Sequence, residues 1–188
     1  MNEVQWMSTV AEYLAKTIQA LDSKLSVKQG LKLLYSHEIR SYDGDEPAES
    51  VPFPYETDLI VVETADSNQW KPRVVVEGKL EKVSTHDAIT YSDKAAAHKR
   101  LHPYLRYGIL LGKRSDYALP GRLFHHGLNF DFMLSWREET PSSTELKNLK
   151  SIILAEVEAS RRLEEVLYSS RLVDRTRYTV VHKALRME

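Results

Sequence analysis

Apolar residues follow two different spacings along this chain, and the changes between them predict an alternation of helices and strands. Over residues 3–22 and again over residues 144–168, apolar side chains recur three or four positions apart, which is typical of amphipathic helices. Residues 59–62 and 74–76 are short continuous runs of leucine, isoleucine and valine, which favour buried strands. A turn-forming segment, Thr64 to Pro72, separates the two runs, so we expect them to be neighbouring strands.

Local signals around these runs predict further elements. Ser26 suits the N-cap of a second helix, whose inward face would hold Leu31, Leu34, Tyr35 and Glu38. Residues 41–54 are rich in Asp, Glu, Gly, Ser and Pro, and they predict an exposed loop. Thr85 suits the N-cap of a helix through Leu101. Three more strands are predicted, a buried one at 107–112 and weaker ones at 128–136 and 178–181.

This order of elements predicts an α/β fold, with a central mixed β-sheet flanked by α-helices. A chain of 188 residues is long enough to bury a sizeable core, so we expect a single domain over residues 1–188. The core would span about residues 26–136. The N-terminal helix, 3–22, and a C-terminal helical region, 142–188, would be additions to it.

Composition excludes few classes of protein. Cysteine is absent, which rules out disulfides and thiolate metal sites and fits a reducing compartment. The sequence shows no secretory signal pattern and no apolar run near the roughly 18 residues that span a bilayer, so we expect a cytoplasmic protein without membrane association.

A net charge of -1 does not indicate a nucleic-acid binder, but the charge is unevenly distributed. Two basic clusters stand out, and each is equally compatible with a solvated helix surface. They consist of Lys94, His98, Lys99, Arg100, His102 and Arg106, and of Arg171, Arg175, Arg177, Lys183 and Arg186.

Charged residues also interrupt the two central apolar runs. Asp58 precedes the first run, and Glu77 and Lys79 end the second. If Thr64 lies opposite Arg73 in a hairpin, Asp58 lies opposite Lys79, and Asp58, Glu77 and Lys79 share one face of the sheet. A slip of one residue would move Asp58 to the other face.

An acid, any residue and a lysine form a common triplet, found here at 22–24, 77–79 and 145–147. Only the middle triplet ends a β-branched run that follows an acid-bearing run. In these residues the chain resembles the PD-(D/E)XK nuclease superfamily, the restriction-endonuclease-like fold. Asp58 matches its first acid, Glu77 and Lys79 its second acid and lysine, and Glu38 the acid of the preceding helix. The resemblance covers about residues 26–112.

One departure from the pattern is visible, because Thr57 stands where the superfamily carries a proline. The resemblance implies a Mg²⁺-dependent DNA endonuclease in which Mn²⁺ can substitute. Its metal ligands would be Asp58, Glu77, Glu38 and the backbone carbonyl of Gly78, because Mg²⁺ prefers oxygen ligands. Lys79 would orient or deprotonate the attacking water, or stabilise the transition state.

Each of these residues also has a structural interpretation. Asp58, Glu77 and Lys79 would form a buried ion pair with a capping acid, and Glu38 would be a solvated residue at a helix end. The resemblance further implies a homodimer acting in restriction or defence, with a partner subunit or methyltransferase left open.

The helix predicted over residues 85–101 follows the site that these residues would form. Its small side chains would pack on the sheet while Lys94, His98, Lys99 and Arg100 project toward solvent or toward backbone phosphates of DNA. A zinc pair of His98 and His102 is disfavoured, because Lys99 stands where a zinc protease carries its glutamate and there is no cysteine. The alternative function is a catalytically silent nuclease-like fold that binds nucleic acid or assembles with protein, and a third is an enzyme acting on RNA or on a small phosphorylated substrate.

Overall fold

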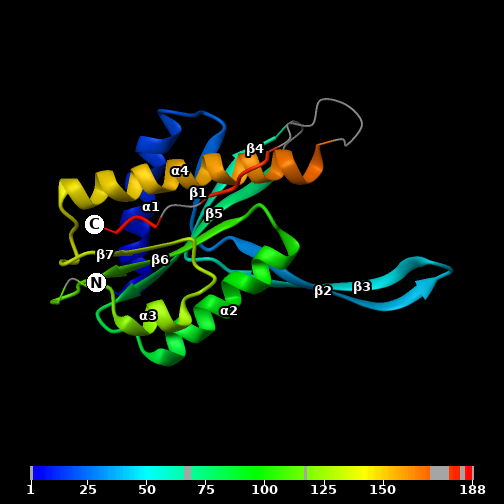
Figure 1. The fold of residues 1–188 in the computed structure, drawn as a ribbon, viewed down its shortest axis with the longest axis horizontal. Helices are drawn as coiled ribbons and strands as arrows, with labels where there is room; N and C mark the ends of the chain where they lie inside the picture. Colours follow the sequence, from blue (N-terminus) through cyan, green and yellow to red (C-terminus); the bar gives the residue numbers. More distant parts are fainter. Residues whose placement is uncertain (1, 66–68, 117, 170–177, 183–184, 188) are drawn as a thin grey trace.

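A five-stranded sheet in the order β1-β4-β5-β6-β7 forms the centre of the computed structural model (Figure 1). The structure describes residues 2–65, 69–116, 118–169, 178–182 and 185–187. The strands are β1 (Leu25–Lys28), β4 (Leu59–Thr64), β5 (Trp70–Leu80), β6 (Arg106–Gly112) and β7 (Phe132–Ser135). Strand β4 is antiparallel to β1 and β5, whereas β5, β6 and β7 run parallel. The predicted α/β class with a mixed sheet is therefore confirmed, and the restriction-endonuclease-like identity of the core stays a prediction.

Helices cover both faces of this sheet. Helices α1 (Glu3–Gln19) and α4 (Ser143–Tyr168) pack on one face, and their apolar stripes meet Leu59, Val61, Val74 and Val76. Helix α2 (Thr85–Leu101) and the short α3 (Gly121–His126) pack on the other face, against side chains that include Ile60, Val75 and Ile109. Because β4 and β5 are covered on both sides, their sequences are continuous apolar runs instead of alternating ones.

The three long helices begin with the same capping box. The side chain of the capping residue accepts a hydrogen bond from the backbone N–H of the third helical residue, whose side chain accepts one from the backbone N–H of the capping residue. The caps are Asn2, Ser84 and Ser142. Helix α2 thus spans the predicted residues, but Ser84 caps it and not Thr85. None of the described helices is long and apolar enough to cross a bilayer.

A long hairpin separates β1 from β4. Strands β2 (Lys32–Asp43) and β3 (Glu46–Glu56) pair with each other and project from the body as a ribbon (Figure 1), which we call the hairpin arm, residues 32–56. The predicted helix after Ser26 and the predicted loop over 41–54 are both wrong. The spacing of Leu31, Leu34 and Glu38 suits a helix locally, but pairing across the chain decides for strands. The prolines of β3, which favoured a loop, are tolerated because β3 is an edge strand.

The remaining elements differ from the predictions mainly at their ends. The first helix stops at Gln19 instead of residue 22, and the strand predicted over 128–136 shortens to β7. The predicted strand at 178–181 is wrong, since these residues form neither helix nor strand. In the second basic cluster Arg171, Arg175, Arg177 and Lys183 lie outside the described residues.

Candidate active site

The register of β4 and β5 differs from the predicted one, but Asp58, Glu77 and Lys79 still share one face of the sheet. Leu59 lies opposite Val76 and Ile60 opposite Val75, so continuing the ladder places Asp58 opposite Glu77 instead of Lys79. The turn closes earlier than expected, with the Ala65 N–H donating to the Gln69 carbonyl, and a bulge follows Val61. A net shift of two residues leaves each side chain on its original face, whereas a shift of one would not.

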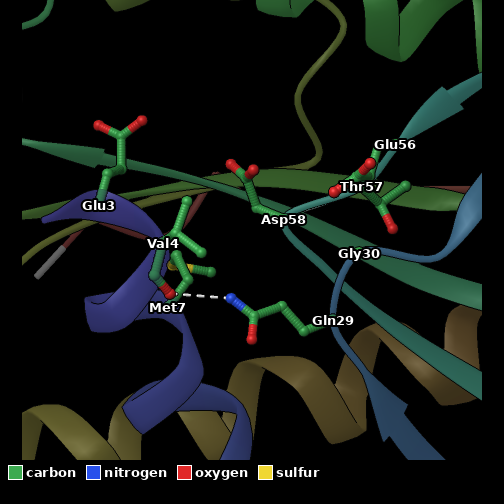
Figure 2. A pocket seen from close by; sticks show the side chains of 8 residues that line it. All are labelled: Glu3, Val4, Met7, Gln29, Gly30, Glu56, Thr57 and Asp58. Atoms are coloured by element: carbon green, nitrogen blue, oxygen red, sulfur yellow. Dashed lines mark hydrogen bonds between the residues drawn. The ribbon is translucent and has the colours of Figure 1, made fainter.

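The β4–β5 ladder ends at Leu59 and Val76, and past this point the carboxylates of Asp58 and Glu3 lie along the edge of β5 that β4 no longer covers. The Asp58 carboxylate accepts a hydrogen bond from the Gly78 N–H at 2.8 Å, and the Glu3 carboxylate accepts one from the Leu80 N–H at 3.1 Å. These two N–H groups are two residues apart on one edge, or about 6.6 Å along the strand. Figure 2 shows both carboxylates directed to the same side of the sheet. Helix α1 therefore brings an acid to the site.

Glu77 is buried, with only 1% of its surface exposed. Its Oε1 accepts hydrogen bonds from the Tyr107 hydroxyl and from the Lys94 ammonium group, the latter at 2.9 Å. Burial raises the pKa of Glu77 to about 6, with a further increase from Asp58 that Lys94 and Tyr107 oppose. The carboxylate is thus held by a hydroxyl and an ammonium group inside the protein.

Lys79 projects toward a different set of groups than the sequence suggested. Its Nζ lies 3.7 Å from Glu3, 3.9 Å from Asp87 and 5.8 Å from the centre of the Tyr91 ring. Burial alone would lower the pKa of Lys79, but Tyr91, Glu3 and Asp87 together raise it above its ordinary value. Lys79 therefore carries its proton at neutral pH.

Glu38 does not lie where a helical segment would have placed it. It lies in strand β2 of the hairpin arm, opposite Val51, and its side chain is exposed. The helix on which its site assignment depended is absent from that segment, and the acid that a helix contributes is Glu3. The sequence carried one signal for Glu3, which stands four residues before the buried Met7 on the same helix face.

Helix α2 turns most of its basic residues inward. His98 is fully buried, and its Nδ1 donates to the Leu34 carbonyl at 3.0 Å. Lys99 contacts the Asn129 carbonyl and the Asp131 carboxylate, and Lys94 reaches Glu77. Of the four predicted phosphate contacts only Arg100 is exposed. The prediction of an outward basic face is wrong for the other three, because the hairpin arm and the segment around Asn129 cover the helix.

The oxygen atoms around Asp58 suit a Mg²⁺ ion that is bound by few protein ligands. Within the described residues, no group of three or more His, Cys, Asp or Glu side chains converges. Asp58 and Glu77 each use one oxygen in the hydrogen bonds above, which leaves the second oxygen of each for a cation. The Gly78 carbonyl points to the same edge as its N–H, since the two groups of one strand residue share a direction. Proteins commonly hold Mg²⁺ through one or two carboxylates, with water and substrate phosphate completing the shell.

A pocket of about 220 Å³ adjoins this edge. Residues of α1, of the segment before β2 and of the arm's end line it, among them Glu3, Gln29, Glu56 and Asp58 (Figure 2). Gln29 fastens one wall by donating to the Val4 carbonyl at 2.9 Å. Three carboxylates border this space, so it favours a cationic occupant over an anionic one unless a metal ion is present.

No protein-family model matches the chain, and no curated protein matches it significantly.

Proposed function

We propose that the protein is a Mg²⁺-dependent DNA endonuclease whose site is built on Asp58, Glu77 and the Gly78 backbone. The observation that carries this proposal is that the carboxylates of Asp58 and Glu77 meet beside the edge of β5 that β4 leaves uncovered. Glu3 and Lys79 lie next to them. The resemblance of Asp58 and the Glu77-Gly78-Lys79 triplet to the PD-(D/E)XK superfamily supports the same conclusion.

Each side chain has a distinct task in this proposal. Asp58, Glu77 and the Gly78 carbonyl would hold Mg²⁺, which would supply positive charge to offset the charge developing on the phosphate. Lys79 stays protonated between Glu3 and Asp87, so it orients the attacking water and stabilises negative charge instead of removing a proton. Glu3 and Asp87 hold the lysine in place, while Tyr107 orients Glu77.

The decisive experiment incubates the purified protein with plasmid, linear duplex, single strands and RNA in Mg²⁺ or Mn²⁺. We expect nicking of DNA that falls on the order of 10²-fold in Lys79→Ala. Lys147→Ala is the matched control, since Lys147 is exposed on α4. Nicking that persists at the full rate in both Lys79→Ala and Asp58→Ala removes the proposed site. Preferred cleavage of RNA would instead favour the third function considered from the sequence.

A catalytically silent fold that binds nucleic acid or a partner protein is the second candidate. It is favoured by the Lys94 ammonium group, which already neutralises Glu77, and by the lack of a three-ligand group within the described residues. Metal-dependent stabilisation separates the two candidates. A site filled at about 100 times its dissociation constant gains about 2.7 kcal/mol, whereas a silent fold gains nothing.

The wider setting is proposed by analogy with the superfamily. We propose DNA as the partner, a homodimer as the active state, a role in restriction or defence, and the cytoplasm as the compartment. The absence of cysteine supports the last of these.

A further inference from the structure

Lys94 joins three parts of the molecule at the acid pair. From helix α2 its Nζ contacts Glu77 Oε1 at 2.9 Å and donates to the Glu56 carbonyl at 2.9 Å. The same atom lies 5.7 Å from the centre of the Tyr55 ring. Its side chain is only 16% exposed, so these contacts replace most of its hydration.

The ammonium group compensates a charge that the fold would otherwise leave unbalanced. Glu77 is buried beside Asp58, and two neighbouring carboxylates without a cation are costly. A divalent cation at this pair would neutralise the same carboxylate. Because two cations at one carboxylate repel each other, Lys94 and the divalent cation compete for Glu77.

The Lys94 ammonium group keeps other partners when it leaves Glu77. The Glu56 carbonyl and the Tyr55 ring lie at the base of the hairpin arm and remain available to the ammonium group. This base is fixed by the Thr57 N–H and hydroxyl, which both donate to the Leu31 carbonyl. A fixed second acceptor keeps the displaced charge partnered.

We propose that Lys94 is a positioning residue that holds the Glu77 carboxylate beside Asp58 while no divalent cation is bound, and that yields Glu77 to the cation. This inference rests on the proposed function, because it assumes that Asp58 and Glu77 bind a divalent cation. It makes Lys94 a determinant of metal affinity and replaces the phosphate contact expected of it from the sequence.

Calorimetric titration with MnCl2 at pH 7.5 tests the competition. Lys94→Met removes the charge and keeps the length of the side chain, so we expect it to bind Mn²⁺ about 5-fold to 10-fold more tightly than the wild type. Lys94→Arg retains a competing cation and should stay near the wild-type affinity. Lys147→Met, on the exposed surface of α4, should leave the affinity unchanged. Equal or weaker binding by Lys94→Met overturns the proposal.

A double-mutant cycle without metal tests the pairing itself. Lys94→Met should lower the urea midpoint in the wild-type background by more than it does in Glu77→Gln, where no carboxylate needs compensation. Equal shifts in the two backgrounds, together with Mn²⁺ binding, refute the function assigned to Lys94 and leave the nuclease proposal standing. Coupling without Mn²⁺ binding in any variant refutes both the metal-dependent function and the displacement of Lys94.

Discussion

The Asp58 carboxylate accepts a hydrogen bond from the backbone N–H of Gly78 at 2.8 Å, at the point where β4 begins and β5 continues with β6 on its other edge. That N–H has lost its neighbouring strand, so the carboxylate completes the sheet edge as well as supplying charge to the site. An amide oxygen can accept the same hydrogen bond but carries no charge. The structural and chemical contributions of Asp58 can therefore be separated by substitution.

Asp58→Asn should change the free energy of unfolding little, while Asp58→Ala should lower it by about 1–2 kcal/mol because the Gly78 N–H loses its acceptor. DNA nicking should be lost in both variants. Urea denaturation and a plasmid assay measure the two effects on the same preparations. Wild-type nicking by Asp58→Asn would show that the charge is not needed.

Glu3→Gln should reduce cleavage about 10-fold to 100-fold, which is typical of residues that support a catalytic group. Glutamine still accepts from the Leu80 N–H but no longer pairs with Lys79. The comparison variant is Glu12→Gln, which lies on the exposed side of the same helix and should cleave normally. Full activity in Glu3→Gln would remove Glu3 from the site.

Gly78→Ala should destabilise the protein by about 1–3 kcal/mol through overpacking. A β-carbon at Gly78 would lie 2.3 Å from the sulfur of Met7, whereas one at Gly121 would meet no atom within 4 Å. Gly121→Ala is therefore the matched control and should be nearly neutral. The double variant with Met7→Ala should be more stable than the sum of the single effects predicts. Strict additivity of the two changes would argue against the close packing of α1 on β5.

His98 should make the protein less stable in mild acid. Burial lowers the pKa of His98 to about 4, with Lys94 and His102 adding to the shift, while an unfolded histidine titrates near 6.5. Because the folded value is the lower one, unfolding takes up a proton between these pH values. The stability from His98 is complete above pH 6.5 and is lost as pH falls toward 4.

Between pH 6.5 and 5 the loss should be about 1.5 kcal/mol in the wild type, and His98→Gln should remove this part of the slope. Urea titrations at the two pH values measure it. His125→Gln, an exposed histidine at the end of α3, should keep the wild-type slope. An unchanged slope in His98→Gln would mean that His98 does not resist protonation in the folded protein.

The sequence determined the elements whose signals are local. The apolar runs of β4 and β5, the spacing of α1, α2 and α4 and the polar caps before them each need only neighbouring residues. The α/β class follows from their order. The common face of Asp58 and Glu77 was also predictable, because an error of two residues in register preserves the face.

Tertiary structure decided whatever depends on pairing between distant segments. Leu31, Leu34 and Glu38 suit a helix by spacing alone, and only the ladder with residues 46–56 makes them a strand. Glu3 is brought to Leu80 by packing across 77 positions of sequence, and the same packing places it beside Lys79. The inward turn of Lys94 and His98 likewise depends on the hairpin arm that covers them. Local propensities fix the elements, whereas the neighbours that bury or pair each charge arise only when the elements pack together.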